Sequence, residues 1–73
     1  MSEIPASPFE RILRNNGAER VSFEAAKYFA EELEEIANIV AEDAISICNY
    51  SKRKTINKKD IEFAIKNFKK KYI

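Results

Sequence analysis

The chain of 73 residues has no histidine and no tryptophan, and it has only one glycine, two prolines and one cysteine. With so few turn-forming residues, it is predicted to form a few long elements rather than many short strands. The missing histidine removes the usual general base near neutral pH, and neither a glycine-rich phosphate loop nor a Cys/His cluster is present. We therefore expect no enzyme, no metal site and no cofactor.

Long apolar runs are also missing, so no membrane-spanning segment is predicted, and the N-terminus lacks the layout of a signal peptide. The single Cys48 excludes an internal disulfide framework and suits a reducing compartment; it is expected to be a small buried apolar residue. We expect a cytoplasmic protein without a membrane partner or a small-molecule substrate. Its length predicts one domain, 1–73, with a short basic end at 66–73.

Charge is distributed unevenly along the chain, although the net charge is only +1. Residues 22–49 hold seven acids and one base, whereas residues 52–73 hold nine bases and two acids. These two stretches therefore carry net charges of −6 and +7. Such separation predicts two differently charged surfaces, of which the basic one suits a polyanion; a solvated lysine tail is the plainer alternative.

A first, short helix is predicted to begin at Ser7, whose side chain could cap it in a Ser-x-x-Glu box completed by Glu10. Pro8 suits the first helical position, and Gly17 ends the helix because glycine accepts a left-handed conformation. A third helix is predicted after Asn57, with a core stripe of Ile61, Ala64, Ile65 and Phe68. The segments 20–22 and 54–56 have β-branched centres and could form brief strands.

The second helix is predicted over 23–50, after Ser22 as its cap, because no proline or glycine interrupts this stretch. Its apolar residues fall within an arc of roughly 140° at 100° per residue, and most of its acids lie opposite. The arc holds Phe23, Ala26, Phe29, Ala30, Leu33, Ile36, Ala37, Val40, Ala41, Ala44, Ile47 and Cys48.

The length of this helix predicts an obligate dimer. At 1.5 Å per residue it would extend about 42 Å, whereas a compact globule of this size has a radius of gyration near 11 Å, that is, a diameter of roughly 29 Å. Two short helices cannot cover its apolar arc, so a second copy is the simplest cover, with the long helices crossing where small residues permit close approach. The predicted dimer core is Phe29, Leu33, Ile36, Ala37, Val40 and Ala44.

Two sets of motifs carry a family resemblance: Gly-Ala-Glu-Arg-Val-Ser at 17–22, and Arg-Lys-Thr-Ile at 53–56 followed by Asp-Ile-Glu at 60–62. With the short–long–short order of helices, the chain resembles archaeal histones along nearly its whole length. The resemblance implies the all-α histone fold, three helices joined by two strap loops in an intertwined dimer. It also implies a nucleoid-associated protein that wraps and compacts double-stranded DNA without reading its sequence.

The resemblance implies DNA contacts from the first helix and from both loops, at Arg11, Arg14, Arg20, Arg53, Lys54 and Thr55. Structural alternatives exist for three of these residues. Arg53 resembles a family position that forms an ion pair with the acid at Asp60, and Arg14 could pair with Glu10 on an exposed helix. Thr55 could simply be a strand residue.

A second contact, between dimers, is implied at Ile47, Tyr50, Asp60 and Phe63, and it would join dimers into tetramers or filaments. Two departures from the family bear on this assembly more than on the fold. Tyr50 stands where the family commonly has histidine, and Lys52 stands where it commonly has glycine. A lysine there must find another helix ending or accept strain.

Two functions remain open from the sequence. One is nonspecific DNA packaging by a homodimer, or by a heterodimer with a second histone. The other is a histone-fold subunit of a transcription complex, which forms a heterodimer and scarcely contacts DNA. The acidic long helix slightly favours the second, whereas the loop cations and Arg11 favour the first strongly.

Overall fold

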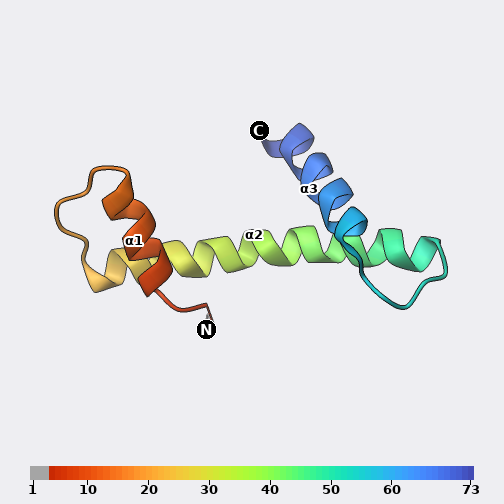
Figure 1. The fold of residues 1–73 in the computed structure, drawn as a ribbon, viewed down its shortest axis with the longest axis horizontal. Helices are drawn as coiled ribbons and strands as arrows, with labels where there is room; N and C mark the ends of the chain where they lie inside the picture. The colour runs from red at the N-terminus through yellow and green to blue at the C-terminus, as the bar shows by residue number, and fades with distance from the viewer. Residues whose placement is uncertain (1–3) are drawn as a thin grey trace. The chain divides into compact units, whose positions relative to one another are not determined.

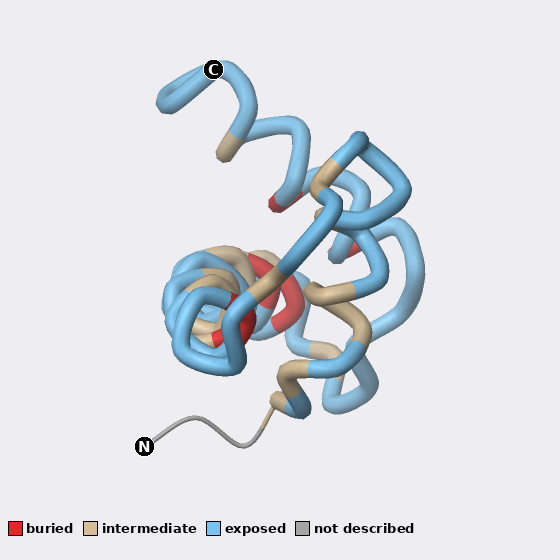
Figure 2. The backbone as a smooth tube through the Cα atoms, turned by 90° about the vertical axis from the view of Figure 1, so that its left-hand side faces the viewer, coloured by how far each residue is buried: buried red, intermediate tan, exposed pale blue. Residues whose placement is uncertain are grey.

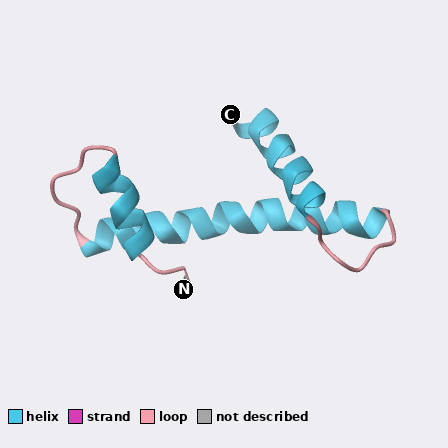
Figure 3. Ribbon diagram, in the orientation of Figure 1, coloured by secondary structure: helices cyan, strands magenta, loops and turns pink. Residues whose placement is uncertain are grey.

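The computed structural model describes residues 4–73, which form three α-helices joined by two loops (Figure 1, Figure 3). They are α1 at Ser7–Asn15, α2 at Phe23–Tyr50 and α3 at Lys58–Tyr72. These bounds confirm the predicted all-α class and the short–long–short order. The chain divides into two compact units, Met1–Ile36 and Ala37–Ile73, and each is described by itself below. No helix in residues 4–73 is long and apolar enough to cross a membrane.

Polar side chains start α2 and α3 as the sequence predicts. The Ser22 hydroxyl accepts a hydrogen bond from the Ala25 backbone N–H at 3.0 Å. At α3, the Asn57 side chain accepts from the Asp60 N–H at 3.3 Å, and the Asp60 carboxylate accepts from the Asn57 N–H at 2.9 Å. This reciprocal capping box satisfies two donors that a helix N-terminus would otherwise leave unpaired.

The predicted capping box at α1 is wrong. Ser7 is already helical, and the N-cap is Ala6, which offers no side-chain acceptor. The backbone carbonyl of Ala6 accepts instead from the N–H groups of Phe9 and Glu10, at 3.0 and 3.1 Å. The Glu10 carboxylate is used elsewhere, because it accepts hydrogen bonds from Arg14 one turn later.

Gly17 ends α1 as predicted, in a left-handed conformation with φ of 109°. Its N–H donates to the Arg14 carbonyl at 3.0 Å, and the Ala18 N–H donates to the Leu13 carbonyl at 3.1 Å. This pair of bonds is the Schellman motif, which satisfies carbonyls at the helix C-terminus.

The C-terminus of α2 has the same motif with a lysine in the left-handed position. Lys52 has φ of 60°, its N–H donates to the Asn49 carbonyl at 2.9 Å, and the Arg53 N–H donates to the Cys48 carbonyl at 3.1 Å. A left-handed residue with a side chain costs roughly 1–2 kcal/mol. A lysine charge near an exposed helix C-terminus returns only about 0.3–1 kcal/mol. Of the two outcomes expected from the sequence, another helix ending or a strained lysine, the structure has the strained lysine.

Segments 20–22 and 54–56, whose β-branched centres could have formed brief strands, are loops, and residues 4–73 contain no strand. Extended backbone becomes a strand only when a second segment supplies a ladder of hydrogen bonds. Neither segment has such a partner within its own compact unit.

Only a few positions along the described chain are buried, as Figure 2 shows, and the apolar ones are small residues. In the first unit, the rings of Phe9 and Phe29 pack with centroids 4.9 Å apart, yet Phe29 stays half-buried. Cys48 is buried, as predicted. No large side chain among the described residues is fully buried, and α2 leaves Ile36 and Ala37 exposed. The buried apolar residues are Ala26, Ala30, Ala44, Cys48 and Ala64.

We predict from this uncovered surface that the unfolding midpoint rises with protein concentration, because a dimer that unfolds to monomers is stabilised by mass action. Ala37→Glu should lower the midpoint strongly, since it would set two like charges against each other where the long helices are expected to cross, at a cost of several kcal/mol. Sedimentation and chemical denaturation over a range of concentrations measure both effects.

Asn38→Glu is the matched control, because it introduces the same charge at the next position, on the opposite side of the predicted arc. Its midpoint should stay close to that of the parent. A folded monomer at micromolar concentration, or a midpoint independent of concentration, would contradict the dimer.

Candidate nucleic-acid interface

In the first unit, Arg14 is held by local contacts. Its guanidinium forms an ion pair with Glu10, with Nη2 and Oε1 3.1 Å apart, and its Nη1 donates to the backbone carbonyl of Glu19 at 3.2 Å. Arg14 therefore connects α1 to the loop that follows, and its charge is offset by an acid. This is the structural alternative that the sequence left open for this residue.

Arg11 and Arg20 differ from Arg14, although the sequence groups all three as DNA contacts. Arg11 lies on α1 and Arg20 lies in the loop before α2, and both are exposed. Within residues 4–73, neither side chain has a hydrogen bond or an ion pair. Their guanidinium groups carry permanent positive charge with five donors each, so they remain free to bind an anion.

The second loop, between α2 and α3, is built around Arg53. Its guanidinium donates to both carboxylate oxygens of Asp60, with Nη1 3.0 Å from Oδ2, and Nη1 also donates to the Thr55 carbonyl at 3.3 Å. The Cys48 thiol lies 3.3 Å from the Arg53 carbonyl and 3.4 Å from the Thr55 carbonyl, so its single hydrogen can be donated to either one. The structure thus brings Arg53, Thr55 and Asp60 together inside one chain, and it leaves Lys54 exposed.

Asp60 is the buried charge of this region, with only 2% of its surface exposed. The hydrogen bonds from Arg53, and then the one from the Asn57 backbone, hold the pKa of the Asp60 carboxyl below its ordinary value. The same side-chain hydrogen bonds raise the pKa of Arg53. Asp60 therefore stays ionised and fixes both the loop and the start of α3.

The residues that the resemblance assigns to a contact between dimers have different environments. Tyr50, at the end of α2, is 91% exposed, and Phe63 on α3 is 57% exposed. Ile47 is half-buried, whereas Asp60 is buried with its oxygens already accepting hydrogen bonds. Two aromatic side chains are thus accessible for contact with another molecule, and Asp60 has little surface to offer one.

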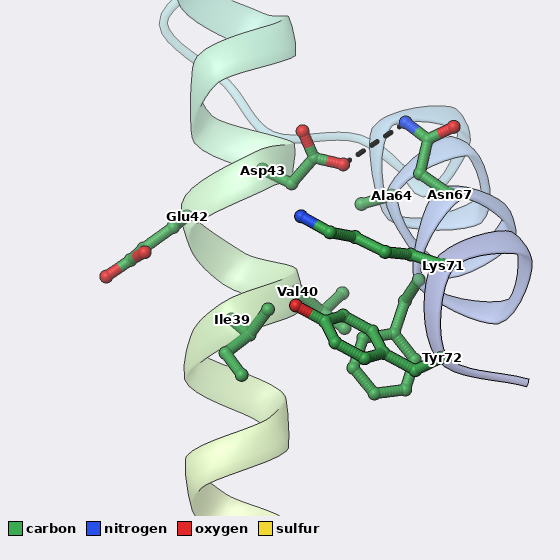
Figure 4. A pocket seen from close by; sticks show the side chains of 9 residues that line it. Ile39, Val40, Glu42, Asp43, Ala64, Asn67, Lys71 and Tyr72 are labelled. Atoms are coloured by element: carbon green, nitrogen blue, oxygen red, sulfur yellow. Dashed lines mark hydrogen bonds between the residues drawn. The ribbon is translucent and has the colours of Figure 1, made fainter.

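A groove of about 460 Å³ lies in the second unit, between α2 and α3 (Figure 4). The Asn67 amide donates to Asp43 across it at 3.2 Å. The rings of Phe68 and Tyr72 pack with centroids 4.8 Å apart, and the Lys71 amine lies 5.6 Å from the Tyr72 centroid. The groove is lined by Ile39, Val40, Glu42, Asp43, Ala64, Asn67, Phe68, Lys71 and Tyr72.

Several groove residues were missed by the sequence reasoning. Ile39 falls outside the predicted apolar arc of α2, although it is a large apolar residue beside Val40. Tyr72 follows Phe68 by four residues, and this helical spacing could have extended the stripe of the third helix. Among residues 4–73, no group of histidine, cysteine or acidic side chains is placed to hold a metal ion.

Comparison with known proteins gives a match over nearly the whole chain. Residues 2–65 match the profile of the family described as "Histone-like transcription factor (CBF/NF-Y) and archaeal histone". The chain is 46% identical to "Probable archaeal histone 3" of Methanocaldococcus jannaschii over 66 residues, which cover 90% of this chain and 98% of that protein. It is 44% identical to one subunit of the archaeal histone HAN1 of Thermococcus zilligii, over the same shares of both chains.

We predict that Asp60→Asn destabilises the protein near neutral pH and that this loss shrinks in acid. Because the pKa of Asp60 is lowered in the folded state, its carboxylate stabilises the fold above the unfolded pKa of about 3.9. That stabilisation disappears as the pH falls through the lower folded pKa. Denaturant unfolding of parent and variant, from pH 7 to about pH 3, should give curves that converge below about pH 4.

Glu62→Gln is the control, since the Glu62 carboxylate is exposed and lies 3.8 Å from the Lys58 amine. An exposed pair of this kind contributes little to stability. A difference between parent and Asp60→Asn that stays constant across the pH range would count against the ionised Asp60 as the source.

Proposed function

The chain belongs to the family of histone-like transcription factors and archaeal histones, and we propose that two copies form a dimer that binds and wraps duplex DNA without reading its sequence. The observation that carries this proposal is the pair of exposed loop cations, Arg20 and Lys54, which have no ionic partner within residues 4–73. Together with Arg11, they give the chain positive groups that its own acids do not neutralise.

The dimer is supported by the apolar surface that one chain leaves uncovered. Ile36 and Ala37 are exposed, Phe29 and Leu33 are half-buried, and Val40 lines the groove between α2 and α3. Ala44 is already buried by its own chain, so it would support the dimer core rather than contact the partner. A second copy would cover these side chains and remove large apolar residues from water, which is the dominant favourable contribution to association.

The geometry of DNA binding follows from an antiparallel crossing of the long helices. In such a dimer, the first loop of one chain lies beside the second loop of the other. Arg20 of one chain and Lys54 of its partner would then form one cationic site at each end of the dimer. These cations and the backbone N–H groups of the loops would bind phosphates, and Arg11 would enter a minor groove that faces the protein.

Arg14, Arg53 and Thr55 have a different role in this proposal. Their polar groups are used within the chain: Arg14 holds the first loop, and Arg53 holds the second loop through Asp60 and the Thr55 carbonyl. They position the loops that carry the phosphate-binding cations. Substitution of Arg14 or Arg53 would weaken DNA binding by disordering a loop, with a parallel loss of stability, whereas Thr55 contributes a backbone carbonyl that a substitution leaves in place.

A second candidate function is favoured by the acids of α2. In a histone-fold protein that forms a heterodimer within a larger complex, an exposed acidic helix could contact another protein. The relative from Thermococcus zilligii is named as one subunit of a histone. Gel-shift experiments with random-sequence duplex DNA separate the two candidates, since a pure adaptor would not bind. The unpartnered Arg20 and Lys54 favour the DNA-binding dimer.

We predict that Arg20→Ala or Lys54→Ala weakens binding to all DNA sequences alike and shallows the salt dependence. Each lost phosphate contact reduces the slope of log K against log salt by about 0.9, so two symmetric losses per dimer give about 1.8. Titrations of random duplex DNA at several salt concentrations measure the slope. Lys27→Ala removes the same charge from the acidic helix and should leave the slope unchanged.

The phosphate assignment would be wrong if either loop variant altered sequence preference and kept the parental slope. Failure of the parent to bind duplex DNA at low salt would instead reject the DNA-binding function as a whole.

We further propose that Tyr50 and Phe63, with the edge of Ile47, join dimers on DNA into longer assemblies. Phe63→Glu would place like charges across that junction and should break it, while each dimer survives because Phe63 is exposed. Nuclease digestion of the complexes should change from a ladder of protected lengths to a single short length. Phe63→Leu keeps an apolar contact and should keep the ladder, whereas an unchanged ladder with Phe63→Glu would exclude this surface.

A further inference from the structure

The second loop begins with Lys52, whose backbone has a left-handed conformation that glycine adopts with less strain. Among residues 4–73, Lys52 is the only non-glycine residue with a positive φ. Two backbone hydrogen bonds fix the conformation, from Lys52 N–H to the Asn49 carbonyl and from Arg53 N–H to the Cys48 carbonyl. Strain of this kind persists where the surrounding structure enforces it, and it often marks a functional position.

No structural contact accounts for the lysine side chain. Lys52 is exposed, and within residues 4–73 its amine has no hydrogen bond or ion pair. The attraction of its charge to the C-terminus of α2 is smaller than the cost of the left-handed conformation. Within the folded chain, a lysine at this position therefore costs more stability than it returns.

The neighbouring Arg53 is not available to bind phosphate. Arg53 is the arginine of the loop motif, but its guanidinium is committed to the buried Asp60 and to the Thr55 carbonyl. Three cations are consecutive at 52–54. The Arg53 guanidinium is bonded to Asp60, whereas the amines of Lys52 and Lys54 remain free to bind an anion. Two exposed lysines thus flank an arginine that is already occupied.

We propose that Lys52 is a phosphate-binding residue of the second loop, placed beside the DNA by the left-handed turn that ends α2. This inference rests on the proposed function and deepens it. Lys52 and Lys54 bind the DNA backbone, while Arg53 holds the loop between them in place. The chain trades stability at the end of α2 for one additional phosphate contact from each copy.

The test compares variants of Lys52 in the full-length protein with random duplex DNA as the probe. Lys52→Gly removes the charge and relieves the strain, so its denaturation midpoint should rise. At the same time the slope of log K against log salt should become shallower by about 1.8 per dimer. When the salt concentration rises fourfold, the loss of affinity should therefore be smaller than in the parent by a factor of about ten. Lys52→Asn removes the charge with a residue that tolerates the left-handed region, and it should reproduce the slope. Lys52→Arg should keep the parental slope.

Two comparisons separate this inference from the proposed function. Lys27→Ala removes a charge from the acidic helix and should keep the parental slope. If Lys52→Gly and Lys52→Asn keep the parental slope while Lys54→Ala shallows it, Lys52 is not a phosphate contact and the proposal is overturned. A parent without salt-dependent DNA binding overturns both this inference and the proposed function.

Discussion

The 28-residue helix α2 carries more apolar surface than two helices of 9 and 15 residues can cover. Its own chain buries Ala26, Ala30, Ala44 and Cys48 along it, which are residues small enough to let α1 or α3 approach closely. The larger side chains remain partly in water. The proposed dimer therefore has its physical reason in the length of one helix, and the placement of the loops at the ends of that dimer would follow from the same crossing.

Helix boundaries could be predicted from the sequence wherever a single local interaction decides them. Ser22 and Asn57 cap α2 and α3 because their side chains reach backbone N–H groups a few residues away, and Gly17 ends α1 because its backbone accepts a positive φ. The Ser7 box is absent because the helix already includes Ser7, with Ala6 as its N-cap, and the Glu10 carboxylate accepts from Arg14 one turn later. The two predicted strands failed for another reason, since a strand depends on a distant partner that local sequence does not contain.

The motifs point to the candidate DNA contacts, and the sequence already offers a local partner for two of them, Asp60 for Arg53 and Glu10 for Arg14. The sequence could not decide whether these pairs form. In the sequence, Arg14, Arg20, Arg53 and Lys54 all carry the same positive charge, whereas the structure shows which charges are already paired. Both held arginines use the fixed fork of the guanidinium to bind an acid and a loop carbonyl at once, which a lysine amine cannot do with the same geometry. An arginine in or next to a basic loop can therefore hold the loop in place, and neighbouring cations without a partner in the chain are then the ones available to bind phosphate.

The uneven distribution of charge explains how a chain with a net charge of only +1 can bind a polyanion. The acids of α2 would repel DNA from the long helix, whereas the loop cations attract it. Attraction by the loop cations and repulsion by the acids of α2 would together orient the protein before contact, and both forces fall off within about 10 Å at 0.1 M salt. The acidic helix would therefore disfavour DNA along α2 and favour its binding at the loops. If Lys52 binds phosphate as proposed, the strain at the end of α2 would be offset by a contact that is made only when DNA is bound.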